Sequence, residues 1–385
     1  MKKSLLLGCC ISLAALYSCG GGSAGGGLPP VPATALNVSG VVATDGIFDP
    51  SPRHDGSGNL WMSYSTVNYS GNDAALTEVR TRVASSTDGG STWTDAGVDP
   101  NNNSNPDFQL TVSGITYWAS WHYEVSSLLY DPYDADTAKR WKMLWHRMAY
   151  VESGGNSNLS IDNSWIGLST ASAPNGAWSA ERKMFAGSIY AAAANTVIGA
   201  PEIQLNMLHT SLNSCIAFTE PSMLAKSDGI YISLNCLGLT PSQVVTSKIV
   251  GVKCNRTFTT CSYLGDFLQG TEAAQFSQSG QALTGFSATE LVSAGGNDYL
   301  IVTPTEPPSD SYRGCLAFRI SDLATATLVR SNGTPSLIKR IYGTSGSFNG
   351  ACGYDTNATG SGIIYSEYNN SAPHFRLFAS HVTLP

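Results

Sequence analysis

Short apolar segments alternate with polar turn residues along most of the chain, and this alternation recurs as a loose repeat. In each copy a first apolar run leads through a turn into a second, aromatic-rich run, and a third run follows. The first two runs lie at residues 49–52 and 60–65, 124–130 and 141–146, 220–224 and 230–234, 290–292 and 299–302, and 351–354 and 363–366. The third runs lie at residues 79–85, 165–169, 248–253, 315–320 and 375–380. Period-two alternation, β-branched residues and Asp-Gly or Gly-Gly turns favour strands joined as hairpins.

A unit of three or four strands that recurs about five times is typical of a β-propeller, whose radial repetition leaves few sheet edges exposed. We therefore predict an all-β fold, a five-bladed β-propeller, with a six-bladed sialidase-like propeller as the alternative. Residues 36–385 are assigned to this single domain. In its YDPYDAD segment, Asp131 and Asp134 are expected to be exposed turn residues.

Composition narrows the classes of function. Charged residues make up only 13% of the chain, about half the usual globular share. The 39 Gly, 17 Tyr and 8 Trp suit short strands and turns better than long surface helices, and 42% hydrophobic residues exclude disorder for most of the chain. A net charge of −7 provides no basic stripe for nucleic acid, so no nucleic-acid partner is expected.

The N-terminus has the pattern of an export signal. Lys2 and Lys3 precede an apolar segment, residues 5–16, that is too short to span a membrane well. Residues 16–20, L-Y-S-C-G, resemble the bacterial lipobox, which implies that residues 1–18 are a signal peptide and that Cys19 is lipidated. Residues 19–35 then form the lipidated cysteine and a Gly/Pro-rich tether. We expect a cell-envelope protein held only by this lipid, at the outer membrane of a Gram-negative cell; a plain secretory signal is the alternative.

The cysteines indicate disulfide bonds. Two of the nine lie in the signal and Cys19 takes the lipid, which leaves six in the domain, an even number that favours disulfides in an exported chain. Cys254 and Cys261 flank a short turn between apolar runs, so they could staple a hairpin. The simplest remaining pairs are Cys215–Cys236 and Cys315–Cys352, although six cysteines allow fifteen connectivities. Zinc binding is the rival interpretation, and no C-x-x-C pair is present.

Acidic residues open four of the five repeats: Asp49, Glu124, Glu220 and Glu290. Because a hairpin starts and ends on the same side, the beginnings of the first strands should gather on one face around the central axis. We therefore expect a ring of four carboxylates there. Crowded carboxylates repel, which raises the pKa of some of them, and such divergence separates a general acid from a general base.

Two resemblances accompany this pattern. Residues 86–93, STDGGSTW, fit S-x-D-x-G-x-T-W, the Asp box of sialidases and other propellers. Asp49 in D-P-S and Glu220 in E-P-S-M-L resemble the acids of the propeller glycoside hydrolases of family 43. That resemblance implies Asp49 as general base, Glu220 as general acid, and Glu124 in the tuning position, where the family has Asp. It also implies inversion at the anomeric carbon, with carboxylates about 6.5–9.5 Å apart.

The same resemblance suggests a carbohydrate substrate and a set of binding residues. Trp118, Trp121 and Tyr123 could stack on a sugar, and His122 and His146 could bind its hydroxyls. We also assign Arg147, which could hold a carboxylate, and Glu290 to substrate binding. No cofactor or metal site is predicted, an axial calcium stays open, and the protein is expected to be a monomer. The alternative function is a non-catalytic propeller that binds glycan or protein at the cell surface.

Overall fold

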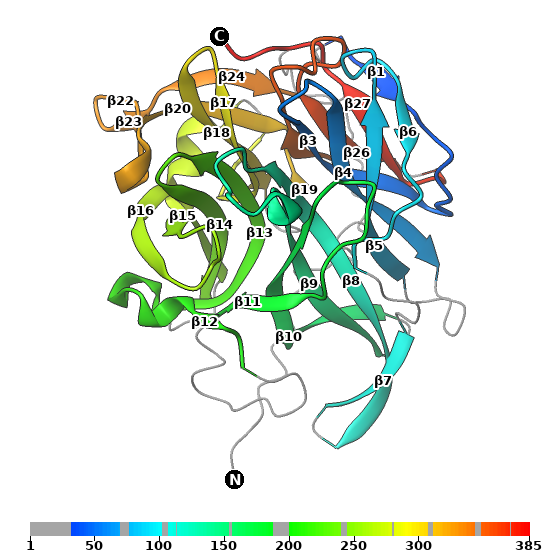
Figure 1. Cartoon of the computed structure of the whole chain (residues 1–385). Coiled ribbons are helices and arrows are strands. Elements are labelled where there is room, and N and C mark those ends of the chain that lie inside the picture. The colour runs from blue at the N-terminus through cyan, green and yellow to red at the C-terminus, as the bar shows by residue number, and fades with distance from the viewer. Residues whose placement is uncertain are drawn as a thin grey trace.

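The computed structural model describes residues 32–69, 77–101, 107–112, 114–153, 156–187, 200–239, 245–278, 281–306, 311–342, 348–369 and 371–385. The predicted signal peptide, Cys19 and most of the predicted tether lie outside these residues. The described chain is built from strands and a few 3-10 helices, as Figure 1 shows, so the all-β prediction is confirmed. None of the helices in this described part is long and apolar enough to span a membrane.

Most strands group into five antiparallel units. Unit 1 contains β3 (Gly46–His54), β4 (Leu60–Tyr69), β5 (Thr77–Ser86) and β6 (Trp93–Asp95), and unit 2 contains β8 (Ile115–Tyr130), β9 (Trp141–Ser153), β10 (Asn156–Ala171) and β11 (Arg182–Ala186). Unit 3 contains β13 (Cys215–Lys226), β14 (Gly229–Leu239), β15 (Val245–Cys254) and β16 (Cys261–Gln269). Unit 4 contains β17 (Gly285–Ala294), β18 (Asn297–Glu306), β20 (Cys315–Asp322) and β24 (Leu337–Ile341). Unit 5 contains β25 (Phe348–Gly353), β26 (Ile364–Tyr368), β27 (Phe375–Ala379) and β1 (Thr34–Leu36).

Shorter elements decorate these units. The strands are β2 (Val38–Ser39), β7 (Asp107–Val112), β12 (Ile203–Gln204), β19 (Ser311–Tyr312), β21 (Thr327–Leu328), β22 (Arg330–Ser331) and β23 (Thr334–Pro335). The 3-10 helices are η2 (Thr137–Lys139), η3 (Leu205–Met207), η4 (Thr210–Leu212), η5 (Gly270–Phe276) and η6 (Leu323–Thr325). β7 pairs with the start of β8 to form a hairpin that projects from the body in Figure 1.

The two ends of the domain meet in unit 5. β1, near the N-terminus, pairs antiparallel with β27, near the C-terminus, over three residues. A single parallel bridge between Phe375 and Gly46 then joins β27 to β3 of unit 1. The pairing of β1 with β27 ties the beginning and the end of the domain together.

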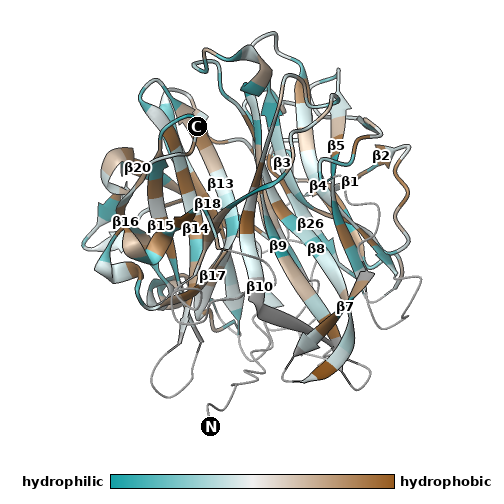
Figure 2. Cartoon of the chain, turned by 60° about the horizontal axis from the view of Figure 1, so that its bottom comes forward, coloured by the Kyte–Doolittle hydropathy of each residue, from teal (hydrophilic) through white to brown (hydrophobic). Residues whose placement is uncertain are grey.

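The hydrophobic core is divided among the interfaces between units. Along the strands apolar and polar residues alternate, which Figure 2 shows as alternating bands of colour. One cluster joins each unit to the next, and a fifth joins unit 5 back to unit 1. Representative members are Val83 with Trp145, Leu144 with Met223, Ile249 with Phe286, Tyr299 with Tyr365, and Met62 with Ile364. Units packed face to face in this cyclic order surround a common axis.

The turn between β5 and β6 is closed by the residues of the predicted Asp box. Oδ1 of Asp88 accepts a hydrogen bond from the backbone N–H of Thr92 at 2.9 Å, and its Oδ2 accepts one from the Thr92 hydroxyl at 2.6 Å. These bonds lower the pKa of Asp88 to about 2. The indole of Trp93 donates to the carbonyl of Gly90 at 3.0 Å and packs against residues of units 1 and 5. The turn therefore positions a large side chain between neighbouring units.

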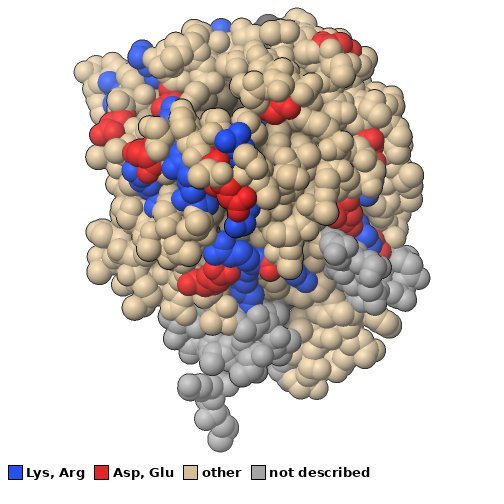
Figure 3. Space-filling view, in the orientation of Figure 1, with Lys and Arg blue, Asp and Glu red and all other residues tan. Residues whose placement is uncertain are grey.

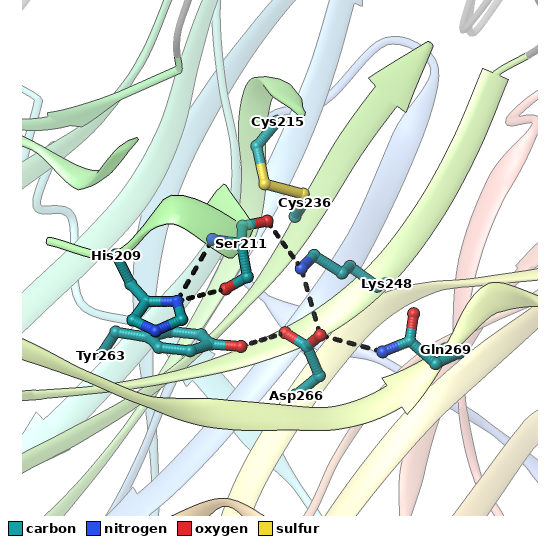
Figure 4. The surroundings of a disulfide bond; sticks show 8 residues. All are labelled: His209, Ser211, Cys215, Cys236, Lys248, Tyr263, Asp266 and Gln269. Carbon is teal, nitrogen blue, oxygen red and sulfur yellow. Dashed lines mark hydrogen bonds and ion pairs between the residues drawn. A yellow bond between two sulfur atoms is a disulfide. The ribbon is translucent and has the colours of Figure 1, made fainter. Parts of the chain in front are cut away.

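The predicted disulfide pairs are all present. Cys215–Cys236 joins β13 to β14, Cys254–Cys261 joins β15 to β16, and Cys315–Cys352 joins unit 4 to unit 5. Figure 4 shows a polar cluster beside the first pair, in which Lys248 lies 3.1 Å from Oδ2 of Asp266 and also donates to the carbonyl of Ser211. The disulfide interpretation of the six cysteines is therefore confirmed.

Many of the charged side chains on the face seen in Figure 3 lie beside side chains of opposite sign. Arg182 pairs with Glu202 at 2.5 Å, and Lys253 pairs with Asp228 at 2.6 Å. The prediction that Asp131 is exposed is wrong. It is fully buried, 3.5 Å from Nζ of the equally buried Lys142, because the turn folds back over the end of unit 2.

Candidate active site

The first strand of every unit is interrupted by a β-bulge. Its pairing with the second strand slips there, and one non-glycine residue adopts a left-handed backbone conformation. These residues are Asp49, Val125, Glu220, Ala288 and Ala351, with φ between 34° and 55°. A bulge re-aims side chains, and left-handed residues of this kind gather at functional sites.

The bulges show that the four acids do not occupy equivalent positions. Asp49 and Glu220 stand at the left-handed residue itself, Glu124 stands one residue before it, and Glu290 stands two residues after it. The predicted ring of four equivalent carboxylates is therefore a staggered set. The reason is that a bulge inserts a residue, so acids at similar distances from a strand start need not share a register.

Asp49 is the central member of this set. Its Oδ2 accepts a hydrogen bond from the backbone N–H of Val125 at 3.1 Å and faces the Ser65 hydroxyl at 3.5 Å. Burial raises the pKa of Asp49 well above its usual 3.8, and the charges of Glu124 and Glu220 raise it further. Carboxyls from units 1, 2 and 3 are therefore close enough to affect one another's ionisation.

Glu220 receives donors on both of its oxygens. Its Oε2 accepts from the backbone N–H of Ala288 at 2.7 Å, from the Asn235 amide at 3.1 Å and from the Ser287 hydroxyl. Its Oε1 accepts from the Tyr312 hydroxyl at 2.7 Å. The N–H groups of Ala288 and Asn235 can only donate, so a proton added to Glu220 has to reside on Oε1.

Glu124 and the two predicted histidines lie close together. Nδ1 of His122 lies 3.0 Å from Oε1 of Glu124, and His122 is completely buried behind it. His146 is paired with Glu124 in the register of β8 and β9, and its Nε2 lies 2.6 Å from the Ser164 hydroxyl. Burial and the neighbouring His122 lower the pKa of His146 to about 3, so this imidazole is neutral.

Arg147 and Trp121 belong to an aromatic cluster on the outer side of Glu124. The guanidinium of Arg147 forms an ion pair with Glu181 and lies over the ring of Trp121 at 4.2 Å and over that of Trp165 at 4.8 Å. Trp121 is also stacked on Phe108 of the β7–β8 hairpin at 4.6 Å. The structure thus gives Arg147 a carboxylate partner within the protein.

Glu290 lies in a deeper layer, where Arg53 holds it. The two side chains form an ion pair with 8% and 3% of their surface exposed. Arg53 also donates to the carbonyl oxygens of Leu291 at 2.9 Å and Tyr354 at 3.3 Å. Burial raises the pKa of Glu290, and the guanidinium opposes this rise. Arg53 thus contacts units 4 and 5 from unit 1 and fills the axis below the other acids.

Serine side chains join neighbouring units at this deeper level. The hydroxyl oxygens of Ser51, Ser127 and Ser222 accept backbone N–H groups of the next unit, those of Leu128, Met223 and Leu291, at 3.3, 2.9 and 2.8 Å. Ser222 donates in turn to Oε2 of Glu290 at 2.9 Å. This repeated bond holds the first strands at fixed distances and so fixes the spacing of the acids above them.

Sequence reasoning missed Tyr312, Ser287 and Arg53. Tyr312 comes from the short strand β19, and burial together with the charge of Glu220 raises its pKa well above the usual 10. Ser287 directly precedes the left-handed residue of unit 4, Ala288. The acid of unit 4, Glu290, stands further along the strand, so no acidic residue beside Ser287 marked it in the sequence. Arg53 lies four residues after Asp49, and this spacing was its only signal.

Within the described ranges no group of three or more His, Cys, Asp or Glu residues is arranged to hold a metal ion. The axial calcium ion that the sequence left open therefore has no such group of ligands among the described residues. The carboxyl groups of the site are instead held by Arg53 and by hydrogen-bond donors of the protein.

Solved structures of known proteins align with most of this chain. The chain aligns over 90% of its length with 89% of a family 117 glycoside hydrolase of the marine bacterium Zobellia galactanivorans, at 12% identity and a TM-score of 0.51. It aligns over 87% of its length with 55% of a family 32 glycoside hydrolase from Bifidobacterium adolescentis, at 8% identity and a TM-score of 0.51. The chain has a glycoside hydrolase-like propeller fold.

A thermostable family-43 glycoside hydrolase also aligns, over 90% of this chain and 91% of its own, at 13% identity and a TM-score of 0.48. No family model matches the sequence. No curated protein matches it either. The propeller prediction is thus confirmed at the level of fold, and the number of blades stays a prediction.

Proposed function

We propose that the protein is a glycoside hydrolase acting on an oligosaccharide or polysaccharide. The observation that carries this proposal is the convergence of Asp49, Glu124 and Glu220 from three units, with the pKa of Asp49 raised by burial and, further, by the charges of the other two. Hydrolysis of a glycoside needs one carboxyl that holds a proton and one that has lost it, and neighbouring carboxyls of unequal environment provide such a pair.

In the proposed reaction Asp49, which must first lose the proton that its raised pKa favours, removes a proton from a water molecule that attacks the anomeric carbon. Glu220 gives the proton on its Oε1 to the leaving glycosidic oxygen as the carbon–oxygen bond breaks, so the anomeric centre inverts. Because Tyr312 donates to the same Oε1, its hydroxyl has to turn or be displaced when Glu220 is protonated. Glu124 sets the charge beside Asp49.

Substrate contacts are proposed on the β7–β8 side of the site. Trp118 has 40% of its surface exposed and stands six residues before Glu124 on β8, which is about 20 Å along an extended strand. It could therefore stack on a distant sugar of a chain, whereas the buried His122 supports Glu124 from behind. This arrangement favours a polymer over a disaccharide.

A second function, a propeller that binds glycan or protein without cleaving it, is favoured by one observation. Both oxygens of Glu220 are already occupied by protein donors, four in all. A carboxyl held by four protein donors can have a purely structural role, in which it joins units 3 and 4.

The test is hydrolysis of a panel of aryl-glycosides and polysaccharides by the purified protein, with binding to a glycan array measured in parallel. Asp49→Asn and Glu220→Gln should each lower turnover at least a hundredfold while the protein stays folded. Asp136→Asn and Glu202→Gln, which alter exposed carboxylates remote from the axis, are the matched controls. Glycan binding without turnover in the parent protein would establish the second function.

We also propose that the domain is exported and anchored through lipid on Cys19 in the cell envelope. Three disulfides in the described domain support an oxidising compartment. Growth with radiolabelled palmitate should label the parent protein and not Cys19→Ala. Label retained by Cys19→Ala, or a membrane-free parent protein, would contradict the anchor.

A further inference from the structure

His122 has contacts that fix where its protons lie. It stands two residues before Glu124 on β8, so both side chains project from the same face of the strand. Its Nε2 lies 2.7 Å from the carbonyl oxygen of Thr77 on β5, and the Thr77 hydroxyl is a more distant neighbour at 3.4 Å. Its Nδ1 lies 3.0 Å from Oε1 of Glu124.

These contacts leave few arrangements of hydrogens. A carbonyl oxygen only accepts hydrogen bonds, so Nε2 of His122 carries a hydrogen. If the imidazole is otherwise neutral, Nδ1 is a bare acceptor and Oε1 of Glu124 has to carry a proton. If Glu124 is ionised, Nδ1 has to carry that proton. Either way a single proton lies between the two groups, and the pair as a whole is neutral.

We propose that His122 is a positioning residue of the candidate active site, which shares one proton with Glu124 so that this pair presents no net charge to Asp49. The part of the proposal that concerns catalysis rests on the proposed function. The shared proton itself does not.

The groups around His122 bear on which residue balances the charge of Glu124. β9 contributes Tyr150, stacked on the imidazole at 4.1 Å, and His146, whose pKa is lowered to about 3 by burial. β5 contributes Thr77, and β8 contributes Glu124 itself. Because His146 is neutral, the imidazole of His122 is the basic group that contacts Glu124 from these elements.

The link to Asp49 is short. Oδ2 of Asp49 accepts the backbone N–H of Val125, the residue that follows Glu124, and the charge of Glu124 is among the causes that raise the pKa of Asp49. Without His122 to share a proton, Glu124 would carry a full negative charge beside Asp49. Asp49 itself has to ionise before it can act as the base. A negative charge close to a carboxyl raises the pKa of that carboxyl by about one unit or more.

Two measurements test the proposal in the full protein. The first follows the imidazole nitrogens of ¹⁵N-histidine-labelled protein by NMR between pH 5 and 8. Nε2 of His122 should stay protonated throughout. A neutral His122 with its hydrogen on Nδ1 and a bare Nε2 would overturn the proposal, whether or not any variant folds.

The second measurement follows the ¹³C signal of the Asp49 carboxyl in His122→Gln, Glu124→Gln and the double variant. His122→Gln should raise the titration midpoint of Asp49 by about one pH unit, a tenfold change in its ionisation constant. Glu124→Gln removes the pair without leaving a net charge, so the Asp49 midpoint should stay close to that of the parent protein, and the double variant should titrate like Glu124→Gln alone. His209→Gln, at the exposed histidine that caps the N-terminus of η4, is the control.

An unchanged midpoint in His122→Gln, or an equal upward shift in both backgrounds, would show that His122 does not act through Glu124. In an active protein the acidic limb of kcat/KM should move with the Asp49 midpoint. If no glycoside is cleaved, the proposed function fails while the NMR titrations still decide the shared proton.

Discussion

The ion pair between Arg53 and Glu290 supplies a quantitative test of the axial architecture. Replacing Arg53 with Met keeps an unbranched side chain of similar length and removes the guanidinium. The substitution leaves Glu290, 3% exposed, as a buried carboxylate without its cation. It also leaves the carbonyl oxygens of Pro52, Leu291 and Tyr354 without this donor.

Breaking a buried pair by removing one partner costs about 3–5 kcal/mol. Native domains have free energies of unfolding of about 5–15 kcal/mol, so Arg53→Met should remove a large share of the total. The assay is urea unfolding under non-reducing conditions. The double variant Arg53→Met with Glu290→Leu should recover most of the loss, because an apolar pair of similar volume replaces the charges. Arg182→Met, which breaks the exposed pair with Glu202, is the matched control and should cost under about 1 kcal/mol.

The loss also has a defined pH dependence. The pKa of Glu290 already lies above its usual 4.5 in the folded protein, and removal of Arg53 raises it further. The folded variant then holds a proton that the unfolded chain releases, so the variant loses stability as pH rises above about 4.5. A loss below about 1 kcal/mol at pH 7, or one that is equal at pH 5 and pH 7, would refute the assignment of Arg53 as the stabilising partner of Glu290.

Three further predictions concern parts of the fold away from the acids. The double variant Cys315→Ala with Cys352→Ala should lose about 4 kcal/mol by the loop-entropy estimate for the 37-residue separation, and unchanged unfolding would show that the disulfide constrains nothing. Trp93→Ala should cost about 3–5 kcal/mol in urea unfolding, because its 1% exposed side chain fills the interface of units 1 and 5, whereas Trp93→Phe should cost less. The Asp355 carboxylate raises the pKa of His54, so this pair stabilises the fold below about pH 6.5 and loses that contribution as pH rises through the folded pKa. Asp355→Asn should flatten the stability profile there, and an unaltered profile would count against the pair.

Local patterns predicted the elements well, because hairpins declare themselves through nearby residues. The alternation, the turn residues and the spacing of Cys254 and Cys261 are all short-range signals, and each led to a correct strand or disulfide. Asp49 and Glu220 stand out in the sequence as acidic residues at the start of apolar strands, and the structure places both at the left-handed residue of a bulge. What the sequence did not reveal is the register of each bulge, which placed Glu290 one layer below the others.

Residues that act across units could not be found from local patterns. Arg53 reaches Glu290 across 237 positions of sequence, and Tyr312 reaches Glu220 across 92. Arg147 was a candidate for a substrate carboxylate because it is a cation near the acids, but its partner Glu181 stands 34 positions away. Which distant residues pair depends on how the sheets pack against one another. The periodic pattern of the sequence does not contain that information.

The balance of charge along the axis bears on the proposed function. Arg53 neutralises Glu290 in the deeper layer, and donors without charge hold Glu220. Asp49 then faces two further acids with a single backbone donor at 3.1 Å and a serine at 3.5 Å, and burial together with the charges of these acids raises its pKa. A propeller needs none of this to be stable, since buried charges can be replaced by apolar side chains without loss of stability and often with a gain. Crowded acids that must share protons are costly to the fold, and they are what acid–base hydrolysis requires.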